Sequence, residues 1–183
     1  MGKKKAKELK ITETKPIVYS GKVILKTVKN GKVTSTKVQH NNGTNALFDF
    51  LLSCLAGAYA TELKPNYITP ILKTNTENIY NYATNGVCTN ISAFNLSLSL
   101  GGNKAPYIEY NFYLSHMNDY QTTGIDGLAL YCDKYAPKAD TEVNIGQQIA
   151  DNYSMIVLFD ENKKLAENEG LIVIWQLSVA NAK

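Results

Sequence analysis

The chain has 183 residues, is 44% hydrophobic and carries a formal net charge of +3. This length supports one domain with a substantial core and is too short for two comfortable ones. All 19 cations are lysines, which argues against sequence-specific DNA recognition, because lysine lacks the planar fork with which arginine reads guanine edges.

The positive charge is concentrated at the N-terminus. Residues 1–10 hold five lysines and one glutamate, which gives +4, and the remaining 14 lysines and 15 acids give −1. The five are Lys3, Lys4, Lys5, Lys7 and Lys10. We therefore expect a basic arm over residues 1–15 and a single domain over residues 16–183. The arm has three open interpretations: a solvated tail, non-specific contact with nucleic-acid phosphates, and docking on a neighbouring protein. We favour docking.

Residues 17–29 and 32–40 predict a β-hairpin, because Asn30-Gly31 is the preferred two-residue turn between strands. The returning strand is polar, rich in β-branched residues and carries Lys32 and Lys37. This composition is typical of an exposed edge strand that lysines protect from unwanted pairing.

Residues 44–57 predict the one clear helix, with Thr44 as N-cap and Gly57 as the C-terminal stop. Phe48 and Leu52 give the helix a second apolar side, so we expect it to be largely covered, by its own sheet or by a neighbouring chain. One apolar stripe has the spacing i, i+3, i+4, i+7 and i+8, and comprises Leu47, Phe50, Leu51, Cys54 and Leu55.

The remainder of the chain reads as strands and turns. Strands are expected at residues 66–73, 91–100, 107–115, 126–132, 154–160 and 171–180. Pro70 weakens the first of these, and residues 74–90 and 161–170 are expected to be loops. About eight strands and one helix predict a mainly β fold, an antiparallel β-sandwich of jelly-roll-like type with one packed α-helix near residues 44–57.

Motifs that carry chemistry are missing from the sequence. It contains no P-loop, GxGxxG, HExxH, nucleophile elbow or EF-hand loop. His40 and His116 are isolated, and a small hydrolase would need a Ser/His/Asp cluster around one of them. Cys54 and Cys132 are expected to pack in the core, and Cys88 lies far from both. We expect no catalytic residue, no cofactor and no metal site.

Two further expectations concern partners. The longest apolar run, residues 46–60, is too short to cross a bilayer, so we expect no membrane contact. Tyr80 and Tyr82 lie in a tyrosine-rich stretch that suits protein interfaces or stacking on sugars, and we favour the interface.

Residues 40–57 follow the pattern His-Asn-x-Gly-Thr-x-x-Leu-Phe-x-Phe-x-x-x-x-Leu-x-Gly. This pattern, placed after an N-terminal hairpin and before Pro65-Asn66-Tyr67-Ile68, resembles one in small structural proteins of tailed bacteriophages. The C-terminal part is similar as well, with a polar hairpin loop through Leu165-Ala166 and a last strand that contains Trp175. The AT-rich composition resembles that of crAss-like gut phages.

The resemblance implies a virion protein that is assembled in the host bacterial cytoplasm, as a capsid auxiliary, head-fibre, collar or tail component. Its partners would be other virion proteins and copies of itself. The expected docking residues are the five lysines of the arm together with Phe48, Leu52, Tyr80 and Tyr82. The alternative is a carbohydrate-binding or adhesin module that uses Tyr80 and Tyr82.

Overall fold

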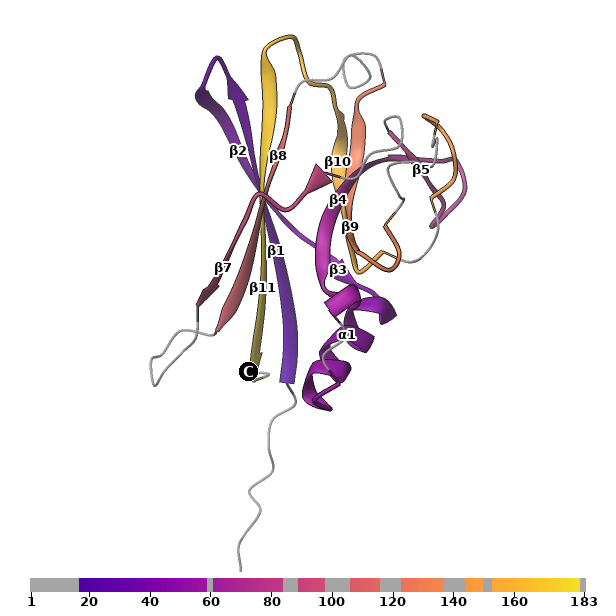
Figure 1. Cartoon of the computed structure of the whole chain (residues 1–183). Helices are drawn as coiled ribbons and strands as arrows, with labels where there is room; N and C mark the ends of the chain where they lie inside the picture. Colours follow the sequence, from indigo (N-terminus) through magenta and orange to yellow (C-terminus); the bar gives the residue numbers. More distant parts are fainter. Residues whose placement is uncertain are drawn as a thin grey trace, which may run out of the picture.

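The computed structural model describes residues 17–58, 61–83, 89–97, 106–115, 123–136, 144–149 and 153–181. Its strands form two antiparallel sheets, with one α-helix beside them in this part of the chain (Figure 1). The expected mainly β, sandwich-like fold is thereby confirmed, whereas the strand order does not establish a jelly roll. The expected basic arm, residues 1–15, lies outside the described residues.

The first sheet, sheet A, has the strand order β2-β1-β11-β8-β7. Its longest strands, β1 and β11, pair over 13 residues each, from Ile17 opposite Asn181 to Lys29 opposite Glu169. Their pairing joins the two ends of the described chain. The bounds are β1 (Ile17–Lys29), β2 (Lys32–His40), β7 (Ala93–Ser97), β8 (Tyr107–Leu114) and β11 (Glu169–Asn181).

The second sheet, sheet B, has the order β3-β10-β9-β4-β5, and β6 also pairs with β4. The chain changes sheet between β2 and β3, between β6 and β7, between β8 and β9, and between β10 and β11. Helix α1 (Asn45–Leu55) and the 3-10 turn η1 (Thr61–Leu63) lead from β3 to β4. The bounds are β3 (Asn42–Gly43), β4 (Pro65–Lys73), β5 (Tyr80–Tyr82), β6 (Thr89–Asn90), β9 (Ile125–Cys132) and β10 (Met155–Lys163).

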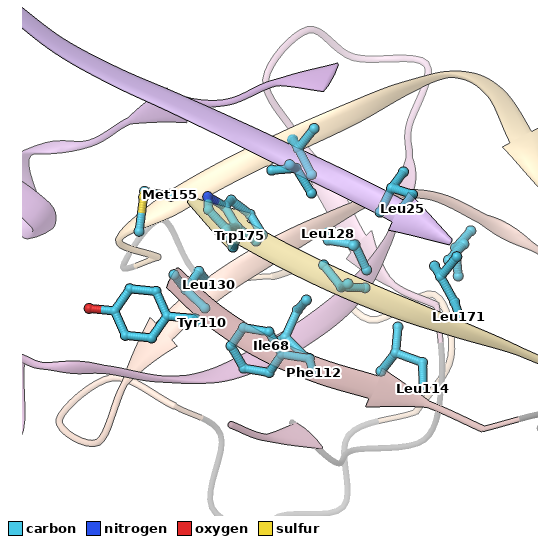
Figure 2. Close-up of a cluster of buried hydrophobic side chains, with 14 of the residues drawn as sticks. Leu25, Ile68, Tyr110, Phe112, Leu114, Leu128, Leu130, Met155, Leu171 and Trp175 are labelled. Atoms are coloured by element: carbon cyan, nitrogen blue, oxygen red, sulfur yellow. The ribbon is translucent and has the colours of Figure 1, made fainter. Parts of the chain in front are cut away.

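The main core lies between the two sheets. Trp175 and Tyr110 are cross-strand partners on β11 and β8, and both are almost fully buried against residues of sheet B such as Leu130 and Met155 (Figure 2). Alternation along β11 produces this arrangement, since Val173 and Trp175 face inward. Each large apolar side chain buried in this way contributes roughly 1.5–3 kcal/mol relative to exposure.

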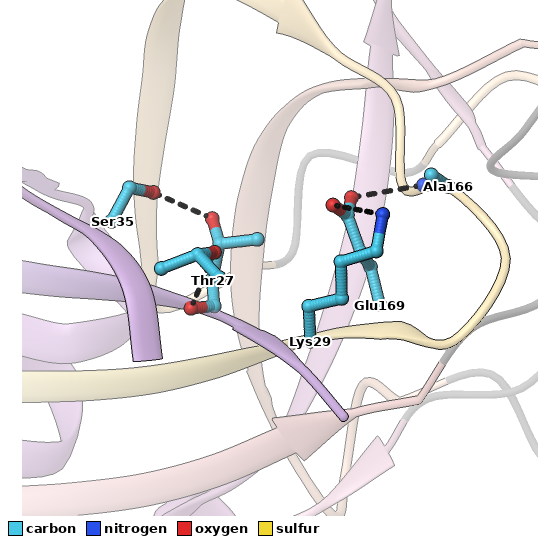
Figure 3. A network of polar contacts seen from close by, with 6 residues as sticks. Thr27, Lys29, Ser35, Ala166 and Glu169 are labelled. Carbon is cyan, nitrogen blue, oxygen red and sulfur yellow. Dashed lines mark hydrogen bonds and ion pairs between the residues drawn. The ribbon is translucent and has the colours of Figure 1, made fainter. Parts of the chain in front are cut away.

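The β1–β2 hairpin has the expected turn, with positive φ at Asn30 (49°) and Gly31 (76°). The pairing shifts between Thr27 and Val28, and Ser35 Oγ donates to Thr27 Oγ1 at 2.9 Å (Figure 3). As predicted, β2 forms an edge of its sheet.

The same end of sheet A is held by charged groups on β1 and β11. Lys29 Nζ lies 3.8 Å from Glu169 Oε1, and the backbone N–H of Ala166 donates to Glu169 Oε2 at 3.0 Å (Figure 3). Glu169 therefore links the start of β11 both to the end of β1 and to the turn that follows β10.

Strand β4 continues through Pro70, which was expected to weaken it. The carbonyl of Pro70 accepts the N–H of Ala83 at 3.1 Å. Because the N–H and C=O of a strand residue project toward the same edge, the donor that proline lacks would also face Ala83 rather than β9. Pairing of β4 with β9 is therefore preserved.

Residues 74–90 contain β5 and β6, where the sequence predicted only a loop. Tyr82 donates its N–H to Gln147 O at 2.9 Å, and Ile149 donates to Tyr80 O at 2.8 Å. These partners lie more than sixty residues away along the chain, so local sequence patterns carry no sign of them. Similarly, β10 and β11 reach further than predicted, and the loop between them shrinks to residues 164–168.

Candidate docking surface

Helix α1 is positioned by a corner at which the chain leaves sheet A for sheet B. Asn41, between β2 and β3, is buried and donates its backbone N–H to Gly21 O at 3.3 Å. Its Nδ2 donates to the Tyr19 hydroxyl at 2.8 Å, and that hydroxyl donates to Met155 Sδ at 3.2 Å. Burial raises the pKa of Tyr19, and the hydrogen bond from Asn41 opposes this in part. The corner thus ties β1 to β10 just before the helix begins.

The start of the helix is held by the segment that leads into β10. Thr44 occupies the N-cap position, as predicted, but its side chain makes no capping hydrogen bond. Instead, the Thr44 hydroxyl donates to the carbonyls of Tyr153 and Ser154, the latter at 2.9 Å. The Thr44 N–H also donates to Ser154 O, at 3.1 Å. These bonds fasten the first turn of α1 to the segment that leads into β10.

The end of the helix is defined by Gly57, whose φ of 71° lies in the left-handed region that favours glycine. The Gly57 N–H donates to Cys54 O at 3.2 Å, and the Ala58 N–H donates to Ser53 O at 3.0 Å. The predicted C-terminal stop is confirmed.

Most of the apolar surface of α1 is not covered by the described chain. Leu47 is 1% exposed and joins the main core, but Phe48 is 45%, Leu52 63% and Leu55 85% exposed. Cys54 is exposed as well. The expectation that Cys54 packs in the core is therefore wrong, whereas Cys132 is buried as expected. Only one line of the helix packs inward, because the helix lies at the end of the sandwich rather than across one of its faces (Figure 1).

A groove of about 330 Å³ separates α1 from the inner face of sheet A. Figure 1 shows the helix beside the stretch of β1 and β11 that extends past sheet B. The groove is almost entirely apolar, and its main lining side chains are Leu47, Phe50, Leu51, Leu96, Ile108 and Leu177.

The far wall of the groove is the edge of sheet A. On β7, Phe94 is 50% and Leu96 57% exposed. They pair with Tyr110 and Ile108 of β8, so they belong to the inner face of the sheet. Lys64 Nζ lies 4.9 Å from the centroid of the Phe94 ring. This edge is therefore apolar but is only partly covered.

The helix side chains Phe48, Leu52 and Leu55, together with the groove and Phe94, constitute what we call the docking surface. A contiguous apolar surface on a small domain marks an interaction site more often than chance exposure of single residues does. Phe48 and Leu52 were among the predicted docking residues, and both lie on this surface. Leu55 was predicted as part of the apolar stripe of the helix, and Phe94 and Leu96 fall in the strand expected at residues 91–100. None of the three was predicted as a docking residue.

Tyr80 and Tyr82 are not part of this surface. They are only 8% and 7% exposed, and they belong to a second core cluster on the other side of sheet B. The Tyr80 ring meets that of Tyr153 edge-on, with centroids 6.5 Å apart. The prediction that these two tyrosines dock a partner or stack on a sugar is corrected, because both residues are buried within the chain itself.

The histidines give no catalytic arrangement in the described part of the chain. His40 is exposed at the end of β2, and its Nδ1 lies 3.3 Å from Gly21 O. His116 and Cys88 lie outside the described residues. No group of three or more His, Cys, Asp and Glu side chains is suitably placed for a metal ion among the residues described. None of the helices in those segments is long and apolar enough to cross a membrane.

Comparison with known proteins gives no assignment. No protein-family model matches the sequence, and searches of curated proteins and of solved structures found no significant match. The functional argument therefore depends on the chain's own surfaces.

Proposed function

We propose that the protein is a structural component of a virion, one that acts through protein–protein assembly and not through catalysis. The observation that carries the proposal is the docking surface, above all Phe48, Leu52 and Leu55 of α1. They remain 45%, 63% and 85% exposed, although the Phe48 ring meets that of Tyr19 edge-on. Three such side chains on one short helix are a poor fit to a monomer that remains free in water, and they suit an interface with a neighbouring chain.

The proposal of a virion role also draws on the resemblance of residues 40–57 to small structural proteins of tailed phages. In this chain that segment contains both the corner at Asn41 and the helix with the exposed apolar side. One stretch therefore supplies a fixed scaffold and a surface for neighbours. The basic arm adds a second contact with another virion protein or with another copy of the chain.

The carbohydrate-binding alternative lacks the stacking surface on which it depended, because Tyr80 and Tyr82 are buried. Stacking on a sugar requires an open ring face. No other described feature favours a glycan site over a protein interface, so we keep the assembly proposal alone.

The test is to purify particles of a phage whose genome encodes this chain and to quantify virion proteins by mass spectrometry. We expect the chain to be present at a fixed copy number relative to the major capsid protein. Its absence from purified particles, despite its expression during infection, would overturn the proposal. A non-structural phage enzyme of similar size and abundance in the lysate is the matched control for contamination.

A further inference from the structure

Strand β7 is an open edge of sheet A. In the described part of the chain it pairs only with β8, so its second row of backbone donors and acceptors has no strand beside it. Four of its five residues are exposed, and Ser97 is half-buried. A row of unpaired backbone groups is a template for an additional strand.

The two edges of the same sheet differ in their protection. The opposite edge, β2, carries exposed Lys32 and Lys37, and Lys37 Nζ forms an ion pair with Asp160 at 2.7 Å. Charged side chains on an edge strand oppose pairing with another chain. Strand β7 reads Ala-Phe-Asn-Leu-Ser and carries no charge. The edge strands of sheet B, β3 and β5, have only two and three residues and offer little length for pairing.

The side chains of β7 also favour an additional strand. Phe94 and Leu96 face the inner side of the sheet, yet they remain half exposed because β7 has no outer neighbour. Tyr110, the cross-strand partner of Phe94 and one strand further into the sheet, is only 1% exposed. A strand placed along β7 would cover the flanks of both side chains, and it would extend the apolar wall of the groove.

We infer that β7 pairs antiparallel with β7 of a second copy, about a two-fold axis that passes between the two Asn95 residues, and joins two five-stranded sheets into one. In this register Phe94 lies opposite Leu96 of the other copy, and each Asn95 lies opposite the other Asn95. The inference deepens the proposed function, because it names the self-contact from which assembly would begin.

A second copy is favoured as the occupant because the strand is self-complementary. Two uncharged strands meet no like charges across the two-fold axis, whereas self-pairing of β2 would bring lysines of the two copies together. Asn95 lies on the outer face, where its Nδ2 donates to Glu109 Oε1 at 3.3 Å. An amide has both donors and acceptors, so two opposed Asn95 side chains can also bond to each other.

The first experiment is sedimentation equilibrium of the full chain from ~1 to ~500 µM, a range that covers the weak to moderate affinities typical of small interfaces. We expect the mass to rise from 20.2 kDa toward twice that value. Leu96→Lys should weaken dimerisation by ~10-fold or more, because it places a charge on the pairing edge. The matched control is Val33→Lys on β2, a residue with a similar exposure of 54%, and it should leave dimerisation unchanged.

The second experiment tests the register in a Cys54→Ser/Cys88→Ser background. Opposed residues on paired strands have Cβ atoms ~4.5–5.5 Å apart, within reach of a disulfide after small adjustment. Asn95→Cys should therefore form a self-disulfide under mild oxidation, and Ala93→Cys should not. A crosslink at both positions, or at position 93 alone, would overturn the register.

At ~500 µM even weak pairing would be visible, so a wild-type chain that stays monomeric there would overturn the inference. Equal effects of Leu96→Lys and Val33→Lys on dimerisation would overturn it as well. Presence of the chain in particles in that case would leave the proposed function intact. Conversely, dimers that form through β7 in a chain absent from particles would remove the proposed function and leave the β7 pairing standing.

Discussion

Asn41 on the corner between the two sheets donates its Nδ2 to the Tyr19 hydroxyl on β1 at 2.8 Å. Its amide fills the space next to Gly21, where an added Cβ would overlap Asn41 Oδ1. Position 21 therefore favours glycine, because the buried Asn41 amide occupies the space that the side chain of any other residue would need. The helix that carries the docking surface begins four residues after Asn41, so this fit determines where that surface lies.

We predict that Gly21→Ala destabilises the fold by ~1–3 kcal/mol, the usual cost of forcing extra atoms into a packed site. The new methyl group would displace the Asn41 amide and break its bond to Tyr19. Urea unfolding checks this, with the fluorescence of Trp175 as the readout, because it is the single tryptophan and is fully buried.

The control is a double-mutant cycle with Asn41→Ala. If the clash is the cause, Gly21→Ala should cost much less in the Asn41→Ala background than in the wild type, because the overlapping atoms are gone. Additive losses would mean that Gly21 is required for another reason.

Leu47 and Leu52 provide a matched pair on one helix. Leu47→Ala should cost ~2–5 kcal/mol, since Leu47 is 1% exposed in the main core. Leu52→Ala should change the free energy of unfolding by no more than ~0.5 kcal/mol, since Leu52 is 63% exposed. Urea unfolding of both variants measures the difference, and equal losses would show that Leu52 is buried in the folded chain.

Leu52→Glu tests whether the exposed side of α1 is needed for assembly into particles. Because Leu52 lies on the docking surface, we expect this variant to fold with normal stability and to be incorporated into particles at least ~10-fold less, as hot-spot residues behave when truncated or charged. The matched control is Glu77→Gln, an exposed change in the β4–β5 connection. Unchanged incorporation of Leu52→Glu would remove α1 from the interface.

The sequence predicted the elements of this fold better than their surroundings. The hairpin with Asn30-Gly31 at its turn and the helix before Gly57 were both found, because turn and stop signals are local. The exposure of Leu55 was not predicted, whereas Leu52 was among the predicted docking residues and is exposed. A helical stripe shows which side of a helix is apolar, but only tertiary placement decides whether that side is covered.

The exposure of strand residues was equally hard to predict from the sequence. Phe94 and Leu96 have the alternation of a core strand, and they do face inward, but the sheet ends at β7 and leaves them half exposed. Tyr80 and Tyr82 read as surface tyrosines, but they are buried in a cluster with residues far away in sequence, such as Ile149 and Tyr153. Neither outcome is encoded within ten residues of the side chain concerned.

Gly127 on β9 is another position where backbone contact restricts the side chain. An added Cβ would overlap the carbonyl oxygen of Val157 on the neighbouring β10. Backbone cannot move aside as a side-chain end can, so Gly127→Ala should destabilise the fold by ~1–3 kcal/mol or more. The comparison variant is Gly31→Ala. An added Cβ has open space at position 31, so this variant has the conformational cost of losing a turn glycine but no clash with backbone. Urea unfolding of both variants measures the two costs.

Glu109 lies at the centre of a polar network on the outer face of sheet A. Its Oε2 accepts from Gln176 Nε2 at 2.7 Å, and its Oε1 accepts from Asn95 and Asn111, each at 3.3 Å. The hydrogen bond from Gln176 is the main cause that lowers the pKa of Glu109, with smaller contributions from both asparagines and from Lys26, against the effect of burial.

A folded-state pKa below the unfolded one means that the unfolded chain binds the proton more tightly. The stabilisation by Glu109 is therefore present above the ordinary glutamate pKa of about 4.3 and is lost as the pH falls through the lower folded value. We expect the free energy of unfolding of Glu109→Gln to fall less than that of the wild type between neutral pH and pH ~3, a range that spans this titration. NMR titration of Gln176→Ala should also show that the pKa of Glu109 moves up. An unchanged pKa in that variant would show that Gln176 is not the group that holds the carboxylate in its charged form.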